Sequence, residues 1–339
     1  MPPLYLTEQG AKLHIDNRRA VATITDRATG ADRELANVPL IHVSEVVIFG
    51  NVSLTTPAMK SLLKDNIDVV FLTLDGQYCG RLVGPATPHV LLRRKQYRAH
   101  ADAAFALKLA QQLVTAKLQH LRVLLQRHNR ERTDEMIAGA IDAIYLQLER
   151  VPRTTTIPAL TGTEGAATAA YFGGLRRLIS PDWQFTKRLR RPPPDPINVL
   201  LSFGYTLLAH AAEGAVAATG LDPYAGFLHT VDYNRPSLAL DVMEEFRPLV
   251  DGVVLWCVNG GQITPADFAP STDPDRPVVM SDRARRRFIE AYERRLAETF
   301  THPKLNQKLS LRQCLLAQAR QVAEAVQADR PEYLPMGFR

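Results

Sequence analysis

The spacing of apolar residues changes near Leu91, and no other feature constrains the fold of this chain as strongly. Over residues 1–85, short runs of apolar and β-branched residues alternate with Gly, Asn and Asp turn signals, a pattern typical of β-strands. Beyond Leu91, apolar residues recur at helical spacing. A chain in which strands come first and helices follow is predicted to be α+β, with the two kinds of structure in separate domains.

The N-terminal part is predicted to be a small β-sandwich. One helix interrupts the strands at about 57–65, where Thr56 is a suitable N-cap and Pro57 suits the first helical position. Asp75-Gly76 predicts a hairpin turn. The expected strands cover residues 4–6, 11–15, 20–25, 43–49, 68–74 and 78–82.

The larger C-terminal part is predicted to be all helical. Gly84-Pro85 and Pro88 indicate a boundary, so we expect a domain over 1–85, a linker over 86–95 and a helical domain over 96–339. The Pro-rich segments 190–196 and 265–277 are predicted to be loops. The expected helices cover about 99–127, 133–149, 164–178, 198–219, 238–247, 281–299 and 310–327.

Three features bear on the location of the protein in the cell. Residues 198–220 contain one charged residue, Glu213, but polar side chains interrupt the segment, so a buried core helix is favoured over a membrane span, which needs about 20 mostly apolar residues. The three cysteines are far apart, which excludes a disulfide framework and a cysteine-based zinc site. The first residues show no signal peptide pattern. We therefore expect a cytoplasmic protein with no membrane association.

Positive charge is concentrated in the helical part. Residues 1–90 carry a net charge of −1 and residues 91–339 a net charge of +7, which permits nucleic-acid binding without establishing it. Phosphate contacts and a solvated surface are equally open interpretations of the basic clusters. The candidate DNA-binding residues are Arg176, Arg177, Lys187, Arg188, Arg190, Arg191 and Arg235.

Three residues are candidates for metal chemistry. Glu164 is predicted to open a helix of small residues, where the helix dipole favours a carboxylate. His229 follows a glycine-containing helix stop, and Glu244 shares one face of a short apolar helix with Asp241. A capping acid and a structural histidine are the simpler interpretations of the first two. Together, the three could hold Mg²⁺ or Mn²⁺ through oxygen and nitrogen, although spacing alone does not show that they meet.

Four ordered segments, residues 162–172, 193–205, 220–229 and 235–248, resemble the motifs of the CRISPR-associated integrase of the "Cas one" family. The resemblance extends over the chain, although the N-terminal part matches by pattern more than by motif. It implies a β-sandwich followed by an α-helical catalytic domain. It also implies metal-dependent cutting and joining of DNA, in which the 3′-hydroxyl of a prespacer strand attacks a phosphodiester of the CRISPR repeat.

The resemblance further implies a homodimer, two of which are bridged by a dimer of the small partner "Cas two" on double-stranded DNA. By motif position, Glu164, His229 and Glu244 take the three metal-ligand roles. Asp241 matches an acid beside the site, and Asn198 falls in a motif near it. Glu245 is predicted to point about 100° away from Glu244 and to matter less.

Two other functions stay open. A stand-alone metal-dependent nuclease for branched or repair DNA would use the same site. A DNA-binding scaffold with an inactive site is the second, and the intact set of Glu164, His229 and Glu244 argues against it.

Overall fold

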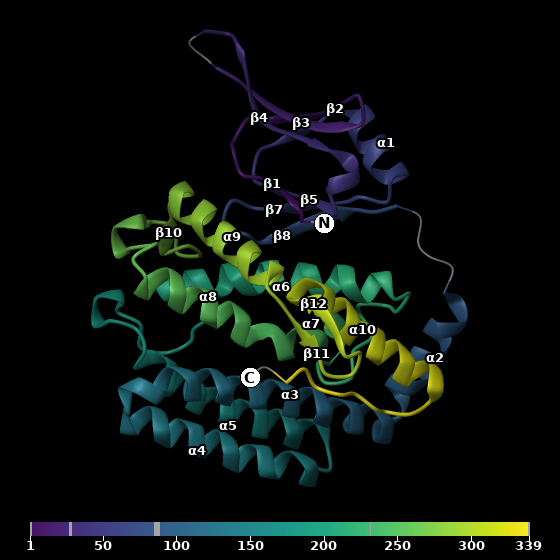
Figure 1. Ribbon diagram of the computed structural model, residues 1–339, viewed down its shortest axis with the longest axis vertical. Coiled ribbons are helices and arrows are strands. Elements are labelled where there is room, and N and C mark those ends of the chain that lie inside the picture. The colour runs from purple at the N-terminus through teal and green to yellow at the C-terminus, as the bar shows by residue number, and fades with distance from the viewer. Residues whose placement is uncertain (1, 27–28, 85–88, 231, 338–339) are drawn as a thin grey trace. The chain divides into compact units, whose positions relative to one another are not determined.

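The computed structural model describes residues 2–26, 29–84, 89–230 and 232–337, and it divides the chain into two compact units, Met1–Thr87 and Pro88–Arg339 (Figure 1). The first unit contains two four-stranded sheets and the second is mainly helical, so the α+β prediction is confirmed. Helix α2 (Val90–Ala101) occupies most of the expected linker, because the helical pattern already begins near Leu91. The remaining linker residues 86–88 lie outside the described residues.

The N-terminal unit is built from two sheets of four strands each. In the first, of order β1-β5-β7-β8, the strands β1, β5 and β7 are parallel and β8 is antiparallel to β7. The second has the order β4-β3-β2-β6. The strands are β1 (Leu4–Leu6), β2 (Lys12–Asp16), β3 (Arg19–Thr25), β4 (Asp32–Pro39), β5 (Glu45–Phe49), β6 (Ser53–Leu54), β7 (Asp68–Leu72) and β8 (Tyr78–Leu82).

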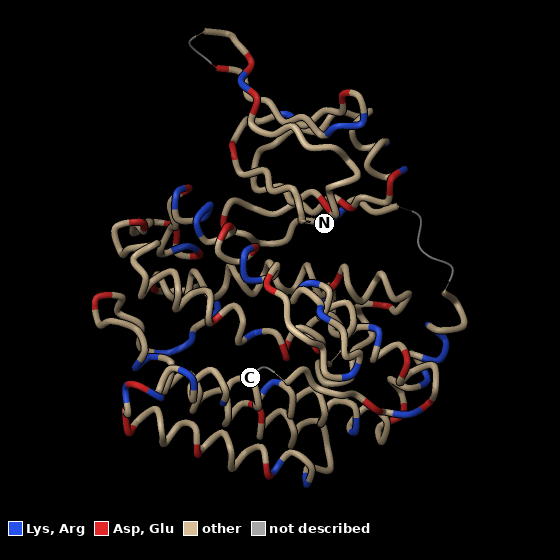
Figure 2. The backbone as a smooth tube through the Cα atoms, viewed as in Figure 1, with Lys and Arg blue, Asp and Glu red and all other residues tan. Residues whose placement is uncertain are grey.

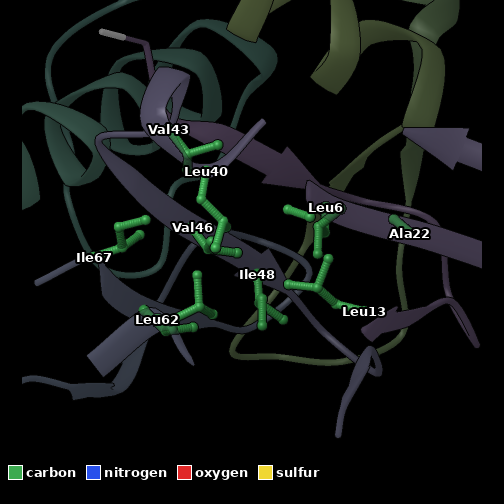
Figure 3. Packing of buried hydrophobic residues seen from close by; sticks show 11 residues of the cluster. Leu6, Leu13, Ala22, Leu40, Val43, Val46, Ile48, Leu62 and Ile67 are labelled. Carbon is green, nitrogen blue, oxygen red and sulfur yellow. The ribbon is translucent and has the colours of Figure 1, made fainter. Parts of the chain in front are cut away.

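One apolar core joins the two sheets. Leu13 comes from the second sheet, Val46 and Ile48 come from the first, and Leu62 comes from helix α1 (Thr56–Lys64) (Figure 3). All four side chains are almost fully buried, and burial of each large aliphatic group contributes roughly 1.5–3 kcal/mol. The N-cap of α1 is Thr55, one residue before the predicted cap.

Strand β4 was not predicted. Its first residues, Asp32, Arg33 and Glu34, are charged and exposed, and charged residues lie along this hairpin (Figure 2). The strand forms because it pairs antiparallel with β3 over its whole length at the edge of the sheet. Backbone hydrogen bonds therefore hold a segment whose side chains favour no strand.

The helical unit is organised around a long helix, α3 (Ala103–Arg132). The single helix expected over 99–127 is two helices, because Asp102 leaves helical geometry and its side chain accepts the backbone N–H groups of Ala104 and Phe105. The other long helices are α4 (Glu135–Arg150), α5 (Ile157–Arg176), α6 (Pro196–Ala218), α9 (Asp282–Ala297) and α10 (Leu311–Ala328).

Helix α6 is long and apolar enough to pass a length-and-hydropathy test for a membrane span, and 56% of the tested window is buried inside the protein. It is followed by α7 (Ser237–Met243), the 3₁₀ helix η4 (Glu244–Phe246) and α8 (Arg247–Asn259). Helix α8 was not predicted. Most of its residues are buried, so its apolar run has no polar face to mark the helical period.

Two short hairpins correct the all-helical prediction for this unit. Strands β9 (Phe268–Pro270) and β10 (Val278–Met280) pair with each other, as do β11 (Thr299–His302) and β12 (Gln307–Ser310). The first pair lies partly in a segment that was expected to be a loop. Strands of three or four residues are too short to show a period in sequence.

Gly204 on α6 tests how tightly the helices pack. A Cβ atom there would lie 2.5 Å from Cγ1 of Val250 and 2.9 Å from Cζ of Phe288. We therefore expect Gly204→Ala to lower the free energy of unfolding by about 1–3 kcal/mol, because a full core cannot absorb an extra methyl group. The matched control is Gly214→Ala in the same helix, where nothing lies within 4 Å of the added atom. It should raise stability by roughly 0.5–1 kcal/mol. Urea unfolding of both variants measures the difference, and equal changes would contradict tight packing at Gly204.

Candidate functional site

The structure brings the two candidate carboxylates together on one lysine, and it places the candidate histidine beside one of them. Glu164 lies on α5, Glu244 begins η4, and His229 lies in the connection between α6 and α7. The ammonium group of Lys117, on α3, contacts the carboxylates of both Glu164 and Glu244. Nε2 of His229 lies 3.8 Å from Oε1 of Glu244. Side chains that are far apart in the sequence therefore meet within the helical unit.

Glu164 was predicted to lie in the first turn of its helix. It lies two turns further in. The side chain of Thr156 caps α5, whose first residue is Ile157. The dipole of the helix terminus falls off within the first turn, so it does not account for this carboxylate. Lys117 and the hydroxyl of Thr168, which donates to Oε1 over 2.7 Å, hold it instead.

Glu244 is a buried carboxylate among cations. Arg247 donates to Oε1 over 2.7 Å, and Nζ of Lys117 lies 2.5 Å from Oε2. Burial by itself raises the pKa of Glu244, but the positive charges of Arg247 and Lys117 outweigh it and hold the pKa well below its ordinary value of 4.5. The carboxylate is therefore ionised at neutral pH, as a metal ligand must be.

Asp241 orients His229. Its Oδ1 lies 2.7 Å from Nδ1 of the imidazole, so the hydrogen-bond network assigns the proton to Nδ1 and leaves the lone pair of Nε2 facing Glu244. The buried carboxylate of Asp241 also accepts the backbone N–H groups of Phe227, Leu228 and His229. One acid therefore fixes both the loop and the ring.

The loop approaches α7 closely at Gly226. A Cβ atom there would lie 2.8 Å from Oδ2 of Asp241 and 2.7 Å from the carbonyl carbon of Ser237. A side chain at this position would therefore push the loop away from the carboxylate that holds it.

The donor groups fit a divalent cation, although the present arrangement is that of a lysine ion pair. Among residues 2–26, 29–84, 89–230 and 232–337, no three His, Cys, Asp or Glu side chains lie close enough together to hold a metal ion as they stand. Oε2 of Glu244 is buried without a well-directed hydrogen bond. Its contact with Nζ of Lys117 is an ion pair, because opposite charges 2.5 Å apart attract each other whatever the hydrogen-bond angle. Two carboxylates that share one cation, with an imidazole nitrogen 3.8 Å from one of them, are a suitable donor set for Mg²⁺ or Mn²⁺.

Lys117 was missed in the sequence, although a signal for it exists. It continues a row of leucines at four-residue spacing on α3, formed by Leu109, Leu113, Leu121 and Leu125, which are all buried. A lysine in such a row lies on the buried face and requires an acidic partner.

Glu245 has a different environment from Glu244 but is no less buried. Its carboxylate accepts hydrogen bonds from the side chains of Gln318 and Tyr333 and from the backbone N–H of Met336. The prediction that it points away from Glu244 agrees with these partners. Removing this fully buried, hydrogen-bonded acid would leave its partners unsatisfied, so Glu245 contributes to stability. The expectation that Glu245→Ala costs much less activity than Glu244→Ala stays a prediction.

A fourth acid of the segment from α7 to α8 extends the network. Asp251, on α8, accepts hydrogen bonds from the hydroxyls of Tyr171 and Tyr205, and burial raises its pKa. The guanidinium of Arg247 lies 4.2 Å from the centre of the Tyr205 ring while it also binds Glu244. The position of Glu244 is thus connected through Arg247 to α5, α6 and α8.

A cavity of about 420 Å³ with basic walls includes the face of α5 next to Glu164. Arg188 is held there by Asn198 and Ser202, at 2.9 and 3.0 Å. Its guanidinium lies 5.5 Å from the centre of the Tyr205 ring, and burial lowers its pKa to about 10, so it is charged at neutral pH. The cavity is lined by Gly165, Thr168, Ala169, Phe172, Gly173, Thr186, Lys187, Arg188 and Arg190.

Asn198 supports this wall rather than the three candidate ligands. Its Oδ1 accepts the backbone N–H of Leu189 over 2.8 Å as well as the bond from Arg188, and its Nδ2 donates to the carbonyl of Lys187 over 2.9 Å. Asn198 therefore shapes the basic loop and acts on the site through it.

The other basic candidates are more scattered. Arg177 is paired with Asp134 at 3.0 Å, so part of its charge is neutralised. Arg176 and Arg191 are exposed, and Arg235 is half-buried before α7. None of these four residues lines the cavity.

Comparisons with known proteins agree with this architecture. The sequence profile of the family described as "CRISPR associated protein Cas1" matches residues 4–294. A CRISPR-associated endonuclease Cas1 of Thermus thermophilus is 36% identical over 337 residues, which cover 99% of this chain and 95% of that protein.

Solved structures share the fold. A Cas6-RT-Cas1–Cas2 complex contains a chain that superposes with a TM-score of 0.83 at 26% identity, covering 99% of this chain and 36% of that one. A casposase bound to integration product superposes with a TM-score of 0.86 at 22% identity, covering 98% of this chain and 92% of that one; this second likeness concerns the fold alone. The family profile and the curated relative both extend over most of the sequence, and the chain belongs to the Cas1 family of CRISPR-associated proteins.

Proposed function

We propose that this protein is a metal-dependent DNA endonuclease and integrase that inserts prespacer DNA into a CRISPR array. The observation that carries the proposal is that Glu164 and Glu244 share the ammonium group of Lys117, with His229 beside Glu244 and a basic cavity next to Glu164. The name of a relative supports part of this activity, since the Cas1 protein of Thermus thermophilus is described as an endonuclease.

The site would hold Mg²⁺ or Mn²⁺ through Glu164, Glu244 and Nε2 of His229. When bound, such a cation neutralises charge on the scissile phosphate and favours ionisation of the attacking hydroxyl. Asp241 keeps His229 in the ligand tautomer. Arg247 keeps Glu244 ionised and in place.

The reaction exchanges one phosphodiester for another. The 3′-oxygen of the prespacer strand forms a bond to a phosphorus of the repeat, the bond from that phosphorus to the repeat's own 3′-oxygen breaks, and the leaving oxygen takes a proton. With water as the nucleophile, the same site would hydrolyse DNA. Lys187, Arg188 and Arg190 lie in the cavity wall, where they would bind phosphates without reading bases.

The assembly belongs to the same proposal. We infer a cytoplasmic homodimer, with two such dimers bridged by a dimer of the small "Cas two" partner on double-stranded DNA. One of the related solved structures is a complex of Cas6-RT-Cas1 with Cas2, which supports this partner. The nearly neutral composition of residues 1–90 leaves little charge repulsion to oppose contact between N-terminal units.

The ligand set is tested by Glu164→Gln, Glu244→Gln and His229→Ala. Each variant should lose roughly a hundredfold or more of cleavage and strand transfer, because one charged or nitrogen donor is removed. The two Glu→Gln changes also keep the shape of the side chain. DNA affinity should persist. The assay is a Mn²⁺ and Mg²⁺ titration on a plasmid that contains CRISPR repeats, with prespacer DNA added.

The control for these variants is Glu149→Gln, an exposed acid on α4, which should keep full activity. Normal activity of His229→Ala at low metal would contradict the three-ligand site. Nicked plasmid without strand-transfer products would favour the stand-alone nuclease. Complete inactivity of the unaltered protein with both metals would favour the scaffold.

Lys117→Met tests whether the lysine and the metal share the same carboxylates. The metal-free variant should lose about 3 kcal/mol of stability, because the buried Glu244 and the half-buried Glu164 lose their common cation. The pKa of Glu244 is depressed in the folded protein, so the stabilisation by Lys117 is present above about pH 4.5 and is lost as the pH falls below that value. Mn²⁺ should raise the melting temperature of the variant more than that of the unaltered chain.

The control for this substitution is Lys108→Met, on the exposed face of the same helix. It should change neither the stability nor the response to Mn²⁺. Thermal unfolding at pH 4 and pH 7, with and without Mn²⁺, measures both effects. Equal stability of the Lys117 variant and the unaltered protein at pH 7 would refute the ion-pair account.

Arg190→Gln tests the basic cavity. If about six phosphates are neutralised, the slope of log affinity against log salt should be near −5 for duplex DNA, and loss of one contact should reduce its magnitude by about 1. Arg150→Gln, on the exposed side of α4 and outside the cavity, is the control. Fluorescence anisotropy over a range of salt gives both slopes, and unchanged slopes would exclude Arg190 as a phosphate contact.

A further inference from the structure

The last residues of the described chain pack back against the segment that carries Glu244. Beyond α10, residues 331–336 run alongside α3 and α10 without regular secondary structure (Figure 1). We call residues 331–336 the C-terminal strap. Tyr333 and Met336 of the strap are almost fully buried, although the strap itself belongs to no helix or strand.

Two glutamines from different helices, the half-buried Gln112 and the buried Gln321, hold the backbone of the strap. Gln112 of α3 accepts the backbone N–H of Tyr333 over 2.7 Å. Gln321 of α10 accepts the N–H of Leu334 over 3.0 Å and donates to its carbonyl over 3.1 Å. Amide side chains that exchange two bonds with one residue act as a strand partner would, so the strap occupies a defined slot.

The strap ends on Glu245. The hydroxyl of Tyr333 and the backbone N–H of Met336 donate to different oxygens of this carboxylate. His120 joins them, with Nδ1 2.9 Å from the carbonyl oxygen of Glu245 and Nε2 in contact with the carbonyl of Met336. These groups stabilise one another, because a buried carboxylate or carbonyl without a hydrogen-bond donor lowers the stability of the folded protein.

The two faces of η4 are therefore held by the same helix. Lys117 and His120 lie one turn apart on α3, and they contact Glu244 and Glu245 respectively. Nothing in the cavity or the ligand set requires the strap, yet it supplies two of the donors that fix the residue next to Glu244.

We infer that the C-terminal strap is a positioning element of the metal site, and that Tyr333 and Met336 act through Glu245 to hold Glu244 in place. This inference rests on the proposed function only in naming Glu244 as a ligand. It assigns to these two residues an effect on metal affinity rather than on DNA affinity. Groups of this kind, which hold a ligand in place, change metal affinity by about 10–100-fold when they are removed.

The test is Tyr333→Phe in the full chain, which removes one hydroxyl and keeps the ring. Calorimetric titration with Mn²⁺, without DNA, should show roughly tenfold weaker binding, while the affinity for DNA is unchanged. In the activity assay, the Mn²⁺ concentration for half-maximal rate should rise by a similar factor, and saturating Mn²⁺ should restore most of the rate. Met336→Pro, which removes the N–H donor to Glu245, should have the same signature.

The control is Glu332→Ala, an exposed residue in the middle of the strap, which should leave Mn²⁺ binding unchanged. If Tyr333→Phe is folded by circular dichroism and binds Mn²⁺ as the unaltered chain does, the inference is wrong, whatever happens to Met336→Pro. Glu244→Gln separates the two proposals. If that variant also binds Mn²⁺ normally, the assignment of the metal ligands has failed rather than the role of the strap.

Discussion

Buried negative charge, and its neutralisation by lysine and arginine, is the constraint on which the helical unit depends. Glu244 is almost completely buried, yet Arg247 and Lys117 keep it ionised. Lys117 also contacts Glu164, so one ammonium group ties together α3, α5 and η4. An uncompensated charge at this depth would cost several kcal/mol. The same electrostatics that stabilises this packing therefore leaves two carboxylates gathered at one point, where we propose that a divalent cation binds.

The acidic residues of the short segment from α7 to α8 contact different parts of the helical unit. Asp241 holds the loop of His229, Glu244 faces Lys117, and Glu245 faces the C-terminal strap. Asp251 joins two tyrosines. Each acid has its own partners, so the segment connects elements that are distant in the chain. A small displacement of this segment would move Glu244, which is one of the proposed metal ligands. The buried polar groups around the segment hold it in place.

Much of the architecture could be predicted from periodicity and capping. The change near Leu91 predicted an α+β chain, and the two-unit division occurs close to it. The failures have physical causes. Strand β4 is polar because it lies at a sheet edge, whereas α8 shows no period because it is buried nearly all round. The helix break at Asp102 depends on hydrogen bonds from two backbone N–H groups to the side chain of that one residue. The spacing of apolar residues gives no sign of such a cap.

By itself, the sequence determined the order of strands and helices, the excess of positive charge after residue 90 and the family motifs that contain Glu164, His229 and Glu244. These follow from local spacing and residue type. Only the tertiary structure decided that the three meet, that Lys117 lies between two of them, and that Tyr333 and Met336 reach Glu245. The physical reason is that ion pairs and hydrogen bonds act over a few ångströms in space, and helix packing, not sequence separation, sets which side chains come within that distance.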